Sequence, residues 1–282
     1  MWAFCGVIAL SILVTYSREP HEKLYNVTSD GLSLGLSRMV VFWNWPAALM
    51  ATMVLGIVVE RVRRPFVAVT ALVLCLIIFI PGVIEQAHLE AKWVNAFPAL
   101  GVALVFALTV AAARNGGIGG WGSPRGDKLR IAIAAVLAVV SVPWILAEQG
   151  IYSGDIPGLS SIVLSKQIYE GLAAVHLGEH HGFTGVQVIV AVLLLSRELP
   201  RLRPSRRRTA LAAWMSGLFA YGLGNVANDV WGEQVVKRGW SGWEMPSVVR
   251  PSGTWLWLVV LAVGAAIFVF LRRSLLGSEK PA

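Results

Sequence analysis

The sequence predicts an all-α integral membrane protein: one polytopic domain of about eight transmembrane helices covering residues 1–282. Of its 282 residues, 56% are hydrophobic and only 14% are charged, which departs from the composition of soluble domains. Apolar stretches long enough to approach or cross the ~30 Å hydrocarbon layer also recur along the whole chain. Most basic residues lie in every second segment between these stretches, and so on one side of the predicted membrane domain.

Eight apolar stretches are candidate spans: Trp2–Tyr16, Met39–Glu60, Phe66–Ile84, Pro98–Ala113, Ile131–Ala147, Ala173–Ser196, Thr209–Val226 and Thr254–Leu271. The first is short, and a cleaved signal peptide is its alternative interpretation. A retained helix is favoured because the stretch lacks a basic n-region and an A-x-A cleavage pattern. Residues 227–253 are expected to form a long outer loop. Residues 161–174 are expected to form an interfacial helix or a continuation of the sixth span above the membrane.

Charge predicts the orientation. If the spans alternate, 16 of the 24 basic residues follow even-numbered spans, and the positive-inside rule places these segments and both termini in the cytoplasm. The net charge of +8 is therefore explained by orientation, and no nucleic-acid partner is expected. The other side carries 12 of the 16 carboxylates and all five histidines, so the functional face is expected outside. The excess of Arg over Lys favours a bacterial cytoplasmic membrane.

The densest group of ionisable residues is His176-Leu-Gly-Glu179-His180-His181-Gly182. Ionisable groups are costly in hydrocarbon unless they face a cavity or one another, so this segment is the main candidate for function. On a helix, His176, Glu179 and His180 would share one face. The opposite face would carry small residues that allow close helix packing; these are Gly171, Gly178, Gly182 and Gly185.

The pattern His176-x-x-Glu179-His180 resembles the H-x-x-E-H zinc motif of inverzincin proteases over these five residues alone. The resemblance implies that His176 and His180 bind a divalent metal ion while Glu179 acts as the general base. Zinc is the favoured metal, with iron or copper as alternatives. Family membership is not implied, because those proteases are soluble.

Further ligands are expected from other segments. Glu85-x-x-His88 has the i, i+3 spacing of Glu-x-x-His in di-iron carboxylate bundles. Glu233 is another candidate ligand, and Glu148 and Asp229 are candidate catalytic residues that would tune or complete the site. Two alternatives stay open: haem b ligated by His88 with His176 or His180, and histidines that merely tie helices together by hydrogen bonds.

A short pattern also repeats along the chain. Three of the five glutamines directly follow a glutamate, as Glu85-Gln86, Glu148-Gln149 and Glu233-Gln234, and each pair lies near the outer end of an odd-numbered span. Spans 3–8 are therefore expected to form three diverged hairpins whose polar ends meet at one vestibule.

Aromatic residues are concentrated on the outer side, where nine of the twelve tryptophans are expected. An interfacial belt would populate both sides, so the excess predicts rings that contact a lipid-like substrate. Trp231 and Trp240 are the candidate stacking residues. Arg238 is a candidate for holding an anionic headgroup.

These observations predict a membrane-embedded, metal-dependent enzyme that acts at the outer leaflet on a lipid-like or amphipathic molecule, with hydrolysis favoured over oxidation. One alternative is a proton- or cation-coupled transporter. The scarcity of charged residues in the middle of the spans argues against it. The other is a non-catalytic subunit of a larger complex, which would have membrane-protein partners.

Overall fold

A computed structural model describes residues 1–18, 27–62, 65–84, 90–115, 126–142, 146, 156–158, 164–169, 172–175 and 180–276. Within these ranges the chain forms eight α-helices and one small sheet. The α-helices are α1 (Trp2–Tyr16), α2 (Gly31–Val58), α3 (Pro65–Leu76), α4 (Ala96–Arg114), α5 (Asp127–Val140), α8 (His180–Leu195), α9 (Arg206–Val230) and α10 (Trp255–Leu276). Each of the eight predicted apolar stretches therefore contains a helix.

Shorter elements extend several of these helices. The 3₁₀-helices are η2 (Val59–Arg61), η3 (Ile77–Phe79), η4 (Trp93–Asn95) and η6 (Ser196–Arg201). A π-helix, η7 (Trp231–Val236), continues directly from α9. The helical path thus runs ten residues into the segment 227–253, which the sequence analysis expected to be an outer loop.

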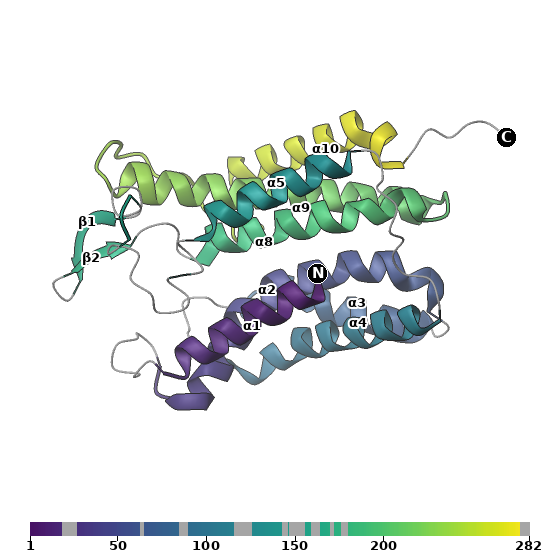
Figure 1. Cartoon of the computed structure of the whole chain (residues 1–282), viewed down its shortest axis with the longest axis horizontal. Coiled ribbons are helices and arrows are strands. Elements are labelled where there is room, and N and C mark those ends of the chain that lie inside the picture. The colour runs from purple at the N-terminus through teal and green to yellow at the C-terminus, as the bar shows by residue number, and fades with distance from the viewer. Residues whose placement is uncertain are drawn as a thin grey trace.

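The helices form two groups, one made of α1–α4 and the other of α5 and α8–α10 (Figure 1). Helix α2 joins them. It packs against α1, α3 and α4 in its own group and against α8 and α9 in the other. Most of its side chains are buried, including Trp45 and Pro46 in its middle. A helix that is apolar all round is expected at such a central position.

Successive α-helices run in opposite directions, so connections gather at two ends of the bundle (Figure 1). One end carries Arg61, Arg114, Arg130 and the segment Arg197–Arg208; we call it the basic end. The other carries Asp30, Glu90, Asp229 and Glu233; we call it the acidic end. Each end also carries charges of the other sign, such as Asp127 beside Arg197 at the basic end and Lys237 beside Glu233 at the acidic end, and the predicted orientation stays a prediction.

Four helical segments in the described part of the chain are long and apolar enough to cross a membrane: Gly31–Arg61, Trp93–Arg114, Gly182–Arg201 and Arg206–Val236. Shorter apolar helices cover Trp2–Tyr16, Pro65–Phe79 and Trp255–Phe270. These lengths and compositions indicate an integral membrane protein. Eight crossings and the three-hairpin repeat stay predictions.

One part of the fold differs from the all-α prediction. Strands β1 (Leu164–Tyr169) and β2 (Leu172–Val175) form an antiparallel pair, with Tyr169 opposite Leu172. The expected helix over 161–174 is therefore wrong, and the helix of the sixth stretch begins at His180 rather than Ala173. Ile168 and Tyr169 have high strand propensity.

Glycines bring α8 and α9 into close contact, as the sequence predicts for Gly182 and Gly185. A Cβ atom at Gly185 would lie 2.6 Å from the backbone oxygen of Gly222, and one at Gly222 would lie 2.8 Å from the backbone oxygen of Gly185. No larger residue fits at either position without separating the helices. This contact fixes how the acidic end of α9 lies against the start of α8.

Candidate functional site

Two buried carboxylates lie at the acidic end of α9. Asp229 is in the last turn of the α-helix, and Glu233 follows one turn later in the π-helix η7. The side chains of Asp229 and Glu233 are only 7% and 5% exposed. Both belong to a helical segment apolar enough to cross a membrane, where buried acids commonly mark functional sites. Single-turn π-helices are also frequent at such sites.

Asp229 packs directly against the first turn of α8. A Cβ atom at Gly182 would lie 2.5 Å from Oδ2 of Asp229 and 2.7 Å from its carboxyl carbon. The carboxylate therefore occupies space that a side chain at position 182 would fill. Because Gly182 follows His180 and His181 in the chain, the backbone of these two histidines lies in the turn of α8 that Asp229 contacts.

Glu233 forms an ion pair on its own helix. Its Oε1 atom lies 2.7 Å from Nζ of Lys237, one turn further along. The side chain of Lys237 is 28% exposed and that of Glu233 is 6% exposed, so the pair lies at the boundary of the packed bundle. Lys237 thus provides a cation beside the acidic pair.

Most of the predicted metal site falls outside the described residues. This holds for Glu85, His88, Glu148, His176 and Glu179, and only the backbone of His180 is described. Within the described ranges, no three His, Cys, Asp or Glu side chains are grouped closely enough to hold a metal ion. Of the predicted ligands and catalytic residues, the structure therefore places Asp229 and Glu233 one turn apart on the same helical segment, with Asp229 against the start of α8.

The predicted substrate residues lie in or just after η7 and form two separate contacts. Nε1 of Trp231 donates a hydrogen bond to the backbone oxygen of Trp243 at 2.9 Å, and the two rings meet edge to face. Trp243 in turn stacks on Trp255 at the start of α10. The guanidinium carbon of Arg238 lies 5.6 Å from the ring centre of Trp240, which is 72% exposed. Trp240 and Arg238 thus offer an aromatic and a cationic surface together.

The sequence analysis missed an apolar cavity between α2, α9 and α10, closed on one side by Phe79. It has a volume of about 680 Å³, within the ~300–1,000 Å³ range of small-molecule sites. Along α9 its wall runs from Ala210 to Tyr221, or roughly 16 Å at 1.5 Å per residue. Small residues make the space, namely Ala210, Ala213 and Gly217 on α9 and Gly264 and Ala265 on α10. Their helical spacing was a signal that could have revealed it.

Polar and aromatic groups close the cavity toward the acidic end. The hydroxyl of Tyr221 accepts a hydrogen bond from Nε1 of Trp45 at 2.8 Å and donates one to the backbone oxygen of Val249 at 3.0 Å. The ring of Tyr221 stacks on Trp257, whose Nε1 donates to the backbone oxygen of Arg250. Tyr221 precedes Asp229 by eight residues, about 12 Å along α9. The cavity and the acidic pair thus lie along the same helical segment, α9 and η7.

No family model, no similar protein and no solved structure matches this sequence.

Proposed function

We propose that this protein is a membrane-embedded, metal-dependent enzyme that hydrolyses a lipid-like or amphipathic substrate at the acidic end of the bundle. The observation that carries the proposal is the buried pair Asp229 and Glu233 on one helix, with Asp229 against Gly182 in the first turn of α8, the helix that begins at His180. Buried acids beside histidines supply the ligand types that zinc and iron take in proteins.

The cavity between α2, α9 and α10 supports the lipid-like substrate class. Its lining is almost entirely apolar, and its long axis follows helices that are apolar enough to lie in a membrane. An alkyl or prenyl chain would fill it, with the polar head directed past Tyr221 toward the acidic end. Trp240 and Arg238 would then contact the headgroup.

The proposed roles follow from the chemistry of each group. His176 and His180, with Glu85, His88 or Glu233, would hold the metal ion, and Glu179 would transfer the proton. Asp229 and Glu148 would orient ligands or the attacking water. A bound divalent ion would supply an activated water or polarise the bond that is cleaved.

The proposed topology has eight crossings with the basic end in the cytoplasm. The positive-inside rule supports this assignment, because Arg61, Arg114 and the segment Arg197–Arg208 all gather at the basic end. The acidic end, with the proposed site, would then face outward.

The experiment that tests the proposal is metal analysis of the purified full-length protein. We expect about one tightly held zinc or iron ion per chain, lost in the variants His176→Ala and Asp229→Asn. Glu244→Gln is the matched control, because Glu244 is exposed on the segment that follows η7. Metal retained in both site variants, or absent from the unmodified protein, contradicts the proposal.

Proton-coupled transport is the second candidate function, favoured by one observation: Asp229 and Glu233 are buried within an apolar helix. Such acids commonly relay protons. Proton flux into proteoliposomes that disappears in Glu233→Gln, in protein that carries no metal, would favour transport over catalysis.

A further inference from the structure

A separate pocket lies between α3 and α4 at the basic end, and we call it the α3–α4 pocket. It has a volume of about 350 Å³. Two polar residues line it, Arg61 at the end of η2 and Asn115 directly after α4. The rest of the wall is apolar and includes Val67 on α3 and Leu104, Ala107, Leu108 and Ala111 on α4. The pocket is therefore amphipathic, with a cation at one end.

The length of the pocket matches one leaflet of a membrane. The segments Gly31–Arg61 and Trp93–Arg114 are both long and apolar enough to cross a membrane, and both end at the polar end of the pocket. Along α4 the wall runs back from Asn115 to Leu104, roughly 16 Å at 1.5 Å per residue. This is about half of the ~30 Å hydrocarbon layer. A lipid whose headgroup lies at Arg61 would thus have its acyl chain along the apolar wall.

Arg61 is available to an anion. Within the described part of the chain, its side chain takes part in no hydrogen bond or ion pair. The carboxylate of the adjacent Glu60 lies 3.6 Å from Nη2 of Arg207 instead. The other two carboxylates described at this end also lie beside arginines other than Arg61, as the pairs Asp127–Arg197 and Glu198–Arg201. A guanidinium group has five N–H donors in a planar fork that suits a phosphate.

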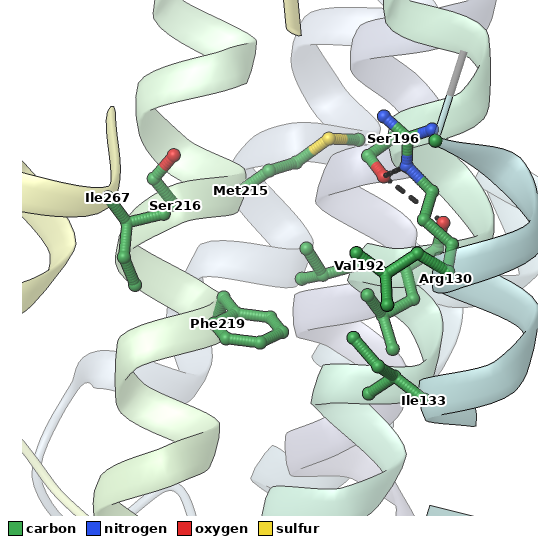
Figure 2. A pocket seen from close by; sticks show the side chains of 11 residues that line it. Arg130, Ile133, Val192, Ser196, Met215, Ser216, Phe219 and Ile267 are labelled. Atoms are coloured by element: carbon green, nitrogen blue, oxygen red, sulfur yellow. Dashed lines mark hydrogen bonds between the residues drawn. The ribbon is translucent and has the colours of Figure 1, made fainter. Parts of the chain in front are cut away.

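A second pocket at the basic end shows the contrasting case. It lies between α5, α8, α9 and α10, and its arginine is Arg130. Nε of Arg130 donates a hydrogen bond to Oγ of Ser196 at 3.1 Å (Figure 2), and the negative charge of Asp127 also acts on this guanidinium. Groups of the protein itself therefore hold Arg130, which distinguishes it from Arg61.

The α3–α4 pocket is open on its outer side. Ala107 and Ala111 line it and are themselves exposed, so its space is continuous with the surroundings of the bundle. Phe66 and Val69 on α3 are exposed as well, which leaves apolar surface on both sides of the opening. A soluble anion would occupy only the polar end and leave this surface uncovered, whereas a lipid covers it.

We propose that the α3–α4 pocket binds an anionic phospholipid of the leaflet at the basic end. The phosphate lies on Arg61, and one acyl chain runs along Leu104, Ala107 and Ala111 toward the middle of the membrane. Basic pockets between membrane helices bind such headgroups in other membrane proteins. This site is independent of the acidic end and of its proposed chemistry.

The test measures lipid binding to the full-length protein in detergent. The protein is titrated with phosphatidylglycerol or phosphatidylcholine, the bound lipid is counted by native mass spectrometry, and the unfolding temperature is recorded. The unmodified protein should bind phosphatidylglycerol more tightly than phosphatidylcholine. In Arg61→Gln the apparent affinity for phosphatidylglycerol should fall about tenfold or more, as expected for the loss of a hydrogen bond to a charged group. Arg203→Gln removes an exposed arginine from the same end and should leave the affinity unchanged.

A second pair of variants tests the apolar part of the pocket. Ala111→Trp fills it and should weaken phosphatidylglycerol binding while Arg61 is retained. Ala113→Trp adds the same side chain two residues along α4, at an exposed position that does not line the pocket, and should not weaken binding.

Three results would overturn the proposal. The first is equal phosphatidylglycerol binding in all four variants. The second is equal stabilisation by glycerol phosphate alone, which would show an anion site without a lipid chain. The third is an Arg61→Gln variant that loses affinity equally for phosphatidylglycerol and phosphatidylcholine, because the arginine would then not select an anionic headgroup.

Discussion

The indole Nε1 of Trp45 on α2 lies 2.8 Å from the hydroxyl oxygen of Tyr221 on α9. The same hydroxyl donates a hydrogen bond to the backbone oxygen of Val249, close to the start of α10. One buried hydroxyl therefore joins three segments from the two helix groups, at the acidic end of the apolar cavity. Its position defines where the cavity ends and where the polar region begins.

Tyr221→Phe should lower the stability of the bundle. The substitution leaves the indole N–H of Trp45 and the carbonyl of Val249 without their partner, and an unsatisfied buried polar group costs about 1–3 kcal/mol. Thermal unfolding in detergent measures the change. Trp45→Phe retains the bond to Val249 and should cost less; equal costs would contradict the proposed linking role of the hydroxyl.

Gly185→Ala should also destabilise the protein, because the new Cβ atom would meet the backbone oxygen of Gly222, which cannot rotate away. Overpacking of this kind typically costs about 1–3 kcal/mol. Gly6→Ala in α1 is the matched control: nothing lies within 4 Å of a Cβ there. That substitution should be neutral or gain about 0.5–1 kcal/mol in helix stability. An equally stable Gly185→Ala variant would show that α8 and α9 separate freely.

The helices could be predicted because apolar length and charge distribution are local properties of the chain. Helix α1 has the bounds expected from the sequence, and the close approach at Gly182 and Gly185 follows from small residues on one face. The β1–β2 hairpin could not be predicted from apolarity alone, since short apolar runs such as Leu172–Val175 fit a strand or a helix equally well. The cavity depends on side chains from three helices, so the small residues spaced along α9 and α10 indicated room beside each helix but not which helices would surround it.

The cavity makes a further prediction. Ala213→Trp should fill it and prevent an alkyl chain from entering, whereas Ala262→Trp places the same side chain at an exposed position of α10 that does not line it. A photoactivatable long-chain alkyl probe, with its crosslinks mapped by mass spectrometry, should label residues 210–221 and 257–268. The label should be lost in the first variant and kept in the second. If Ala213→Trp leaves the labelling unchanged, the alkyl chain does not bind in the cavity.

Glu90 should make stability depend on pH at the acidic end. Its Oε1 accepts hydrogen bonds from the backbone N–H groups of Thr28 and Ser29, at 2.7 and 2.8 Å, and these lower the pKa of Glu90 below the ordinary value of 4.5. A carboxyl whose pKa falls on folding stabilises the folded state above its unfolded pKa. That contribution is lost as the pH falls through the folded value.

Glu90→Ala should therefore lower the unfolding temperature at about pH 7 and have a smaller effect at a pH below the lowered pKa of Glu90, where the unmodified carboxyl is protonated in the folded and unfolded states alike. Glu244→Ala, at an exposed position, serves as the control and should change little at either pH. The same loss at both pH values would mean that packing rather than ionisation is responsible.

The candidate site was predicted only in part. Sequence reasoning selected Asp229 and Glu233 as outer-side carboxylates that could complete a metal site and placed them in a loop, whereas the structure places both, buried, one turn apart in a helix. It expected Asp229 to tune or complete a metal site held by His176 and His180, which would share the opposite face of the sixth helix from its small residues. The residue of α8 that Asp229 contacts is Gly182, on the face of small residues. Positions 180 and 182 are about 200° apart around a helix, so periodicity within one helix did not determine how its neighbour packs.

The central claim is that the buried acids at the end of α9 belong to a metal site. The most direct test is to measure the metal content of the purified variants Asp229→Asn and Glu233→Gln. The unmodified protein and the variant Glu244→Gln are measured as controls. The account predicts about one divalent ion per chain in the unmodified protein and in Glu244→Gln, with most of it lost when Asp229 or Glu233 is replaced. Undiminished metal in both variants of the acidic pair, or an unmodified protein that holds none after reconstitution with zinc or iron, would contradict it.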